Sequence, residues 1–546
     1  MDIAINAINK ITLLLLLVTV YFVLIFHNLG NSESPQLAWY GQNPAIIDFG
    51  EPVYISRFQF MTGHVREVPF KVIASLDGEN WHFAAIIEQL FPFSWCELHM
   101  NTQAKYVQII PATEHLQLME AAFRDTNDNI ITPYRLLIHG TGHLFDEQHL
   151  VPKYISHMNS TYFDETFHAR VAYEFIYGIT YVDVHPPLGK FLISLSIRNF
   201  GMTPFAWRLA GALAGLTLIP LMYLFGWMIF RSHIWASFTA FIFAFDFMPF
   251  VQARIATLCI FLTLFVVASY LCMYAYKNSN NLKHSLLYLA GSGLFIGLAI
   301  ATKWQGLYAL AALPFMFFPS WLKQYKEKRQ EATIIFGACF VFFIAIPLII
   351  YLLAYIPYVQ AIDTDQSFFA TVIARQELML TYHVHLEEGH EFGSNWWEWP
   401  IIRRPLLLHT IPVAYNTVSS INSLGNPAVW WMGIIALIYA IQYLIKKKEN
   451  RQAISFLLIA YAAQFLPWIF VSRVTFIYHY LPSVAFVVML ITFFFKEFVK
   501  DRKLILAYSA AVLGLFVLFY PILTGAEVSL LFVERFLRWF PSWVLV

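Results

Sequence analysis

Long apolar windows recur along the chain, and polar segments separate them. A helix of about 20 apolar residues is long enough to cross roughly 30 Å of hydrocarbon. The pattern therefore predicts a polytopic α-helical membrane protein with about eleven transmembrane helices. We expect these helices near residues 8–28, 204–230, 233–252, 255–276, 285–302, 304–321, 332–355, 427–445, 453–471, 475–495 and 504–523.

Two apolar segments admit a second interpretation. Residues 1–28 are predicted to contain the first transmembrane helix, and a cleaved signal sequence is the alternative because Lys10 precedes the apolar run. The run from Pro187 to Phe200 is also apolar, but counting it as a span would place the later basic clusters outside. We therefore interpret it as a juxtamembrane or re-entrant helix.

Residues 34–140 follow a different pattern, in which apolar and polar positions alternate with period two. The run Val53–Phe60 is an example, and turn signals such as Asp77-Gly78 separate such runs. This alternation predicts an inserted extracytoplasmic β-sandwich. The remaining segments are an extracytoplasmic loop with juxtamembrane helices at 141–203, transmembrane helices at 204–355, a second extracytoplasmic loop at 356–426, transmembrane helices at 427–523 and an extracytoplasmic tail at 524–546.

Lysine and arginine gather in five clusters between the predicted helices. Cytoplasmic loops carry an excess of these residues, so all five clusters are expected inside. They lie at Arg231, at Lys277 and Lys283, from Lys323 to Arg329, from Lys446 to Arg451, and from Lys496 to Lys503. The sequence thus predicts a multi-pass protein of the cell membrane with a cytoplasmic N-terminus.

Composition agrees with the membrane class. Hydrophobic residues make up 59% of the chain and charged residues only 13%. A soluble protein of this length would need roughly twice that charge to cover its surface. The formal net charge of +1 does not indicate a nucleic-acid partner, because the charges are segregated by side rather than in excess.

Charged residues gather at the predicted outer ends of the helices, which indicates an extracytoplasmic active site. An acidic pair, Asp164-Glu165, lies in the first outer loop. A cation at the end of an apolar helix is costly unless it has an anionic partner. Four such cations beside one carboxylate pair indicate a bound anion, most simply a phosphate at the lipid headgroup level. The alternative is that these side chains snorkel to the interface. The four cations are Arg208, Arg254, Lys303 and Arg473.

The second outer loop adds histidine and aromatic residues. The string His383-x-His385-x-x-Glu388-x-His390 offers groups that suit zinc, but its spacing matches no standard site. No metal is therefore expected, and a divalent metal is the alternative. Trp397 is either an interface anchor or part of an aromatic wall against a sugar or peptide, and Arg404 follows it closely.

Several motifs, spread in order over residues 145–495, resemble the protein O-mannosyltransferases of the GT-C superfamily. They include Phe163-Asp-Glu, Asp183-Val-His-Pro-Pro-Leu-Gly-Lys, Arg208-Leu, Arg254-Ile-Ala-Thr, Thr302-Lys-Trp-Gln-Gly-Leu-Tyr, Trp396-Trp-Glu-Trp-Pro, Asn426-Pro-Ala-Val-Trp-Trp and Arg473-Val-Thr-Phe-Ile-Tyr-His-Tyr-Leu-Pro. The β domain, with Ala74-Ser-Leu-Asp-Gly-Glu-Asn-Trp, is similar to the discoidin (coagulation factor 5/8 type C) family. A discoidin-like insert at this place resembles bacterial members.

The resemblance implies a GT-C fold and an inverting transfer of mannose from a polyprenyl-phosphate donor to Ser or Thr hydroxyls of proteins at the outer membrane face. A related GT-C enzyme that passes another sugar to a lipid or cell-wall glycan is the alternative. A transporter is the contrasting class. Transporters typically have ionisable residues at mid-membrane, whereas here these residues gather at the predicted outer ends of the helices. Expected partners are the lipid-linked donor, an acceptor protein or peptide and membrane lipid. The β domain is expected either to bind a glycan or lipid or to act as a spacer.

The same resemblance implies roles for the candidate residues. Asp164 matches the family's catalytic Asp, and a positioned base contributes typically about 10²–10⁴-fold. Glu165 is expected to orient the acceptor or hold neighbouring cations. Cations can stabilise the phosphate leaving group, so no cofactor is obligatory. Donor or substrate contacts are expected from Arg208, Arg254, Lys303, Arg404, Arg473, His185, His383 and Trp397.

One position departs from the family pattern. Many relatives have Asp in the run after Arg254-Ile-Ala-Thr, where this chain has Cys259. A carboxylate about one helical turn after Arg254 is expected to pair with it, which a thiol cannot do. Either the carboxylate is not essential, or this chain has altered donor handling or weaker activity. Restoring it is expected to raise activity or donor affinity, and the alternative is the cost of a buried, unpaired carboxylate.

Overall fold

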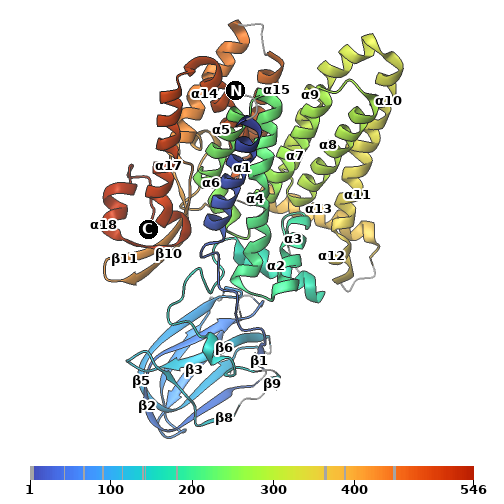
Figure 1. The fold of residues 1–546 in the computed structure, drawn as a ribbon. Helices are drawn as coiled ribbons and strands as arrows, with labels where there is room; N and C mark the ends of the chain where they lie inside the picture. Colours follow the sequence, from blue (N-terminus) through green and yellow to red (C-terminus); the bar gives the residue numbers. More distant parts are fainter. Residues whose placement is uncertain are drawn as a thin grey trace. The chain divides into compact units, whose positions relative to one another are not determined.

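A computed structural model describes residues 5–41, 43–65, 68–88, 91–113, 115–137, 140–141, 143–179, 183–361, 366–386, 389–446 and 451–546. The chain forms two compact units, a helical one and one that carries a β-sheet (Figure 1). The first unit contains Met1–His27, Gly178–Leu192 and Leu209–Val546. The second contains Asn28–Tyr177 and Ile193–Arg208.

Helices occupy the eleven segments in which the apolar windows predict them. In chain order they are α1 (Ile5–Phe26), α4 (Pro204–Phe230), α5 (His233–Ala244), α6 (Phe247–Ala253), α7 (Cys259–Lys277), α8 (Leu282–Thr302), α9 (Gly306–Glu327), α10 to α12 (Arg329–Ala361), α14 (Pro427–Lys446), α15 (Arg451–Phe465), α16 (Leu481–Phe494) and α17 (Arg502–Thr524). The polytopic helical membrane fold is thereby confirmed.

The described residues hold fewer helices of transmembrane length and apolarity than the eleven spans predicted. Eight helices among the described residues are long and apolar enough to cross a membrane, or nine if one bent pair counts as a span. That pair is α5 and α6, which meet at 62°. Asp246 causes the break, because its buried carboxylate accepts hydrogen bonds from the amides of Met248 (3.1 Å) and Asn426 (3.2 Å) and so caps α6.

The expected helix at 255–276 begins only at Cys259. Arg254 ends α6, and the residues between Arg254 and Leu258 are not helical. Arg254 and Cys259 therefore do not share one helix face, and the pairing argument drawn from helical spacing is wrong. The run from Pro187 to Phe200 contains α3 (Leu188–Phe200), whose 13 residues extend about 20 Å, which is too short for a span.

The segment between α12 and α14, predicted as the second extracytoplasmic loop, holds α13 (Phe368–His385) and a hairpin of β10 (Leu406–Ala414) and β11 (Thr417–Ser423). Strand β12 (Glu527–Ser529), from the C-terminal tail, pairs antiparallel with β11. One predicted basic cluster, from Lys446 to Arg451, lies partly outside the described residues.

The second unit contains the predicted β domain, an antiparallel sheet of nine strands. The strands are β1 (Trp39–Gly41), β2 (Ala45–Thr62), β3 (Phe70–Ser75), β4 (Trp81–Ile87), β5 (Trp95–Pro111), β6 (Leu116–Arg124), β7 (Ile130–Ile131), β8 (Arg135–Leu137) and β9 (Gly140–Thr141). Irregular register between β2 and β5 lets these two long strands bend. Stacked rings of Phe58, Phe60 and Phe123 lie in the core.

Candidate active site

Candidate residues lie in both units. In the second unit, Glu165 is the first residue of α2 (Glu165–Tyr177) and its side chain is fully buried. Its carboxylate accepts from Arg208 at two points, Nε to Oε1 at 2.7 Å and Nη2 to Oε2 at 2.8 Å. Trp207 Nε1 donates to the same carboxylate at 3.2 Å. This bidentate geometry is the strongest form of a carboxylate–guanidinium pair.

Arg208 also ties three stretches of backbone to this pair. Nη1 donates to the carbonyls of Leu29 (2.8 Å) and His157 (2.6 Å), and Nη2 donates to that of Ser160 (3.1 Å). A guanidinium has five N–H donors, and these bonds with Glu165 use all five. Arg208 therefore has no N–H left for a donor phosphate. The geometry favours a positioning role for Arg208 over the phosphate contact expected from the sequence. Of the two roles expected for Glu165, it favours that of holding a neighbouring cation.

Asp164 immediately precedes α2 and is only partly buried. Its backbone carbonyl accepts from the amides of Phe167 (3.1 Å) and His168 (3.0 Å), which starts the helix. The preceding residue, Phe163, has a left-handed backbone with φ of 50°. The Arg208–Glu165 pair thus anchors the residue next to Asp164. The carboxylate of Asp164 is more accessible and lies at the positive end of α2.

In the first unit, the loop before α3 is built on Lys190. This buried ammonium forms an ion pair with Asp183 and donates to the carbonyls of His185 and Pro186, each at 3.1 Å. Gly189 allows a close approach here, since a Cβ would meet a Leu258 methyl at 2.5 Å. The loop is therefore rigid and lies against the start of α7.

His185 and His383 come together in the first unit, with ring centroids 5.4 Å apart. His383 lies on α13, and its Nε2–H donates to the carbonyl of Val184 at 3.0 Å. Burial, followed by the nearby positive charges of Arg473 and Lys303, lowers the pKa of His383 to about 4, although the hydrogen bond to the Val184 carbonyl acts in the opposite direction. The imidazole is therefore neutral at pH 7.

Lys303 lies at the end of α8 and is only 7% exposed. Its Nζ is 3.4 Å from Sγ of Cys259 and 5.4 Å from the ring centroid of Tyr478. The residue that departs from the family pattern therefore contacts Lys303. In the described part of the chain, neither Lys303 nor Arg473 forms an ion pair with a carboxylate. Two cations without such partners can bind an anion.

Arg473 lies close to His383, whose pKa it lowers, and it is partly exposed. Its loop is held by Thr475, whose hydroxyl donates to the carbonyl of Ser394 at 2.6 Å and whose carbonyl accepts from the Ser394 amide at 2.8 Å. This contact joins the Arg473 loop to the tryptophan run. Trp397 in that run is 50% exposed.

The two remaining cations have different surroundings. Arg404 is exposed, and its Nη1 donates to the carbonyl of Gly393 at 3.4 Å. Arg254 is buried, and its Nη1 donates to the carbonyls of Leu24 (3.1 Å), Ile25 (2.7 Å) and His27 (2.8 Å). Arg254 thus stabilises the C-terminus of α1, where the helix dipole favours a cation.

The histidine string does not form a metal-type group within the described residues, and Glu388 lies outside them. His385 Nδ1–H donates to the carbonyl of Thr381 at 2.9 Å, while His390 Nδ1 accepts from the amide of Phe392 at 3.1 Å. Among the described residues, the side chains close enough together to hold a metal ion are those of Glu120, Asp146 and Glu147 in the β-sheet unit.

Sequence reasoning did not include Tyr478 and His479 among the site residues, although both stand in the quoted motif after Arg473. The two rings stack with centroids 4.5 Å apart, and His479 is buried against Trp468, also at 4.5 Å. The spacing of charged residues did not identify Tyr478 and His479 as site residues, because their positions depend on the turn before α16.

Comparison with known proteins gives a consistent result. Residues 198–362 match the family model for dolichyl-phosphate-mannose-protein mannosyltransferase, and residues 368–543 match that for the C-terminal four-transmembrane region of protein O-mannosyltransferase. A polyprenol-phosphate-mannose–protein mannosyltransferase of Mycobacterium tuberculosis is 26% identical, with 73% of this chain and 86% of the relative covered. That of Mycolicibacterium smegmatis is 25% identical, with 70% and 87% covered.

The fold is similar to that of a solved structure. A chain of the S. cerevisiae protein O-mannosyltransferase Pmt1-Pmt2 complex, bound to the sugar donor, has a TM-score of 0.63 and 14% sequence identity. The likeness covers 70% of this chain and 89% of that chain. At this identity it supports the fold alone.

Proposed function

Because this chain belongs to the protein O-mannosyltransferase family, we propose that it transfers mannose from a polyprenyl-phosphate donor to Ser or Thr hydroxyls of proteins. The observation that carries the proposal is the pair Lys303 and Arg473. They are cations of one unit without a carboxylate ion pair in the described residues, and they lie beside a neutral His383. Such a group suits the phosphate of the donor.

The reaction is a single displacement. The acceptor hydroxyl oxygen attacks the anomeric carbon of mannose, and a new carbon–oxygen bond forms while the bond to the phosphate oxygen breaks. The proton of the hydroxyl goes to Asp164, and the bonding electron pair leaves with polyprenyl phosphate. Attack from the face opposite the phosphate inverts the anomeric centre. A positioned carboxylate base contributes typically about 10²–10⁴-fold to such a step.

Each candidate residue has a proposed part in this scheme. Lys303 and Arg473 stabilise the charge on the departing phosphate, which makes a metal or other cofactor unnecessary. His383, held neutral, donates to the Val184 carbonyl and keeps the His185 loop in place. Arg208 acts through Glu165 and positions the start of α2. Trp397 and Arg404 are exposed side chains suited to contacts with the acceptor.

The orientation in the membrane is part of the proposal. The basic clusters support a cytoplasmic N-terminus and an extracytoplasmic site. Single cysteines introduced at Lys283 and at Tyr415, which is fully exposed, test it in intact cells. Labelling by a membrane-impermeant reagent is expected only at position 415, and labelling at 283 would contradict this orientation.

The deciding experiment incubates purified protein with polyprenyl-phosphate mannose and Ser- or Thr-containing peptides, and identifies products by mass spectrometry. A peptide with Ala in place of the hydroxyl residues is the acceptor control. Asp164→Asn is expected to lower turnover by about 10²-fold or more with donor binding retained. Glu79→Gln, an exposed acid of the same unit, is the matched control and should retain full turnover. Transfer of a different sugar, or only to lipid, would refute the proposal.

A further inference from the structure

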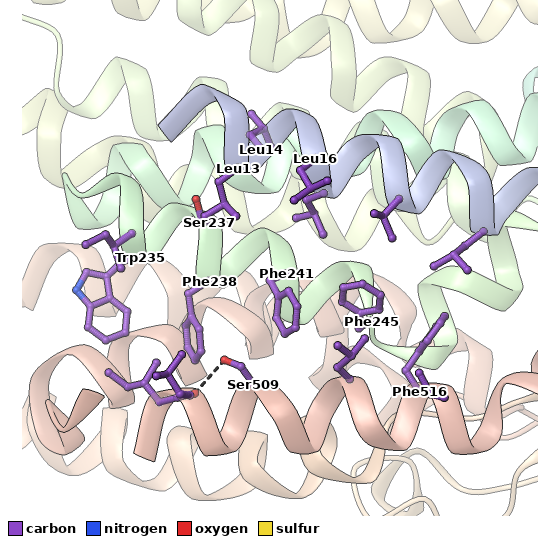
Figure 2. A pocket seen from close by; sticks show the side chains of 18 of the residues that line it. Leu13, Leu14, Leu16, Trp235, Ser237, Phe238, Phe241, Phe245, Ser509 and Phe516 are labelled. Atoms are coloured by element: carbon purple, nitrogen blue, oxygen red, sulfur yellow. Dashed lines mark hydrogen bonds between the residues drawn. The ribbon is translucent and has the colours of Figure 1, made fainter. Parts of the chain in front are cut away.

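An apolar groove lies in the helical unit between α1, α5 and α17. Its volume is about 1220 Å³, which exceeds the roughly 300–1,000 Å³ typical of small-molecule pockets. Figure 2 shows Phe238 and Phe241 of α5, and Phe245 just after it, between the leucines of α1 and the side chains of α17. Aromatic side chains thus line the groove on the side of α5, and aliphatic side chains line it on the side of α1.

The groove is open to its surroundings. Leu16 on α1 is 59% exposed, and Leu506 and Val517 on α17 are 61% and 64% exposed. Exposed apolar side chains on helices of a membrane protein face lipid. An empty apolar groove would also lose the dispersion contacts of its lining. Lipid chains are therefore the occupants that match this surface.

Charge distinguishes the two ends of the groove. At one end lies Arg502, the first residue of α17, which is exposed. The opposite end is formed by Tyr520 and Pro521, and the described lining includes no acidic side chain. Arg502 is thus the one charged group of the described lining, so a lipid with an anionic headgroup would bind in one direction only.

The segment that leads into α17 adds to this positive end. Residues 496–503 contain four basic and two acidic residues, a net charge of +2. Lys496 and Glu497 pair at 3.2 Å, and Asp501 caps α17 by accepting from the Lys503 amide at 2.8 Å. The Asp501 carboxylate thus already serves the N-terminus of α17, and it is the remaining excess positive charge that favours an anion beside Arg502.

The half of the groove next to Arg502 matches the length of one acyl chain, while the groove as a whole continues to Pro521. From Arg502 to Leu513, α17 rises about 16 Å at 1.5 Å per residue. One leaflet is half of a hydrocarbon core of roughly 30 Å, or about 15 Å. Ile505, Leu506 and Ser509 line this stretch, and the Ser509 hydroxyl is satisfied by the Ile505 carbonyl at 2.9 Å (Figure 2).

We propose that this groove is a binding site for an anionic phospholipid. The phosphate lies on Arg502 at the N-terminus of α17, and one acyl chain runs along Phe238 and Phe241 as far as Leu513. The site is separate from the residues assigned to mannose transfer, and it does not depend on the proposed function. Its occupant contributes to holding α1 against α5 and α17.

The test uses the full-length protein in nanodiscs that contain equal amounts of phosphatidylglycerol and phosphatidylcholine. Lipid that stays bound after extraction into detergent is measured by native mass spectrometry. Arg502→Glu is expected to lower retained phosphatidylglycerol at least about tenfold and to leave phosphatidylcholine unchanged. Lys283→Glu, an exposed basic residue of another predicted cytoplasmic cluster, is the matched control and should retain it. Equal retention by the two variants would overturn the proposal.

A second pair of variants tests the chain rather than the charge. Leu506→Trp fills the groove and should also reduce retained phospholipid, whereas Leu504→Trp, at an exposed neighbour outside the lining, should not. Because both sites are exposed, neither change is expected to prevent folding. A retained polyprenyl lipid in place of phospholipid would refute the proposed occupant. Cross-linking of a second copy through position 506 would refute it as well.

Discussion

The Arg208–Glu165 pair allows the most direct test of how the second unit is built. Arg208 is 1% exposed and Glu165 is fully buried, and five hydrogen bonds connect the guanidinium to the carboxylate and to three carbonyls. Arg208→Lys keeps the positive charge but has a single nitrogen in place of a planar fork, so it cannot reproduce the bidentate contact. Arg208→Gln removes the charge as well.

The expected loss is large because a buried carboxylate would remain. Removing one partner of a buried ion pair costs about 3–5 kcal/mol. For a unit of 150–250 residues, each kcal/mol lowers the melting temperature by about 2–4 °C, so Arg208→Gln should melt roughly 6–20 °C earlier. The exposed pair Arg538–Glu534, at 2.9 Å, is the matched control. Arg538→Gln should cost no more than about 1 kcal/mol.

The assay is thermal unfolding of purified protein in detergent, followed by a signal from each unit, together with donor binding by the folded variants. The double variant Glu165→Gln with Arg208→Gln should recover part of the loss, because it leaves no unpaired buried charge. The reasoning would be refuted by an Arg208→Gln protein of parental stability that no longer binds donor. Arg208 would then contact the phosphate, as the sequence alone predicts.

Three further outcomes are expected. The sequence alone predicts that Cys259→Asp raises activity or donor affinity, but the structure places this position beside Lys303, whose Nζ lies 3.4 Å from the thiol, and so reverses the expectation. A carboxylate there should weaken donor binding about tenfold relative to Cys259→Asn, since unit charges at 4 Å interact by about 1–4 kcal/mol. Tighter binding in a binding assay would contradict this. The pKa of His383 is lowered to about 4, so its contribution to stability is present above pH 6.5 and lost as the pH falls toward 4. Melting temperatures between pH 8 and 5 should fall less in His383→Gln, and parallel curves would refute this. Removal of divalent ions with EDTA should leave mannose transfer unchanged, and loss of activity that added metal restores would show a metal requirement.

The local pattern of apolar and polar residues was sufficient for the long helices of the first unit and the long strands of the second, but it did not predict α13 or the strands β10 to β12. Apolar windows placed the helices within a few residues, because a span needs only length and apolarity. Period-two alternation placed the long strands, although β6 is buried on both faces and does not alternate. The break at Asp246 was not predicted, because the carboxylate acts there through the amide of Asn426, 180 residues further along the chain.

The sequence by itself determined the class of the protein, its family motifs and the set of charged residues at the predicted outer ends. Only the tertiary structure decided what each of them contacts. Arg208 is saturated by Glu165 and three carbonyls, and Arg254 holds the end of α1, whereas Lys303 meets the thiol of Cys259. The physical reason is that hydrogen bonds and ion pairs are short-range and link residues far apart in sequence, while composition and periodicity carry only local information.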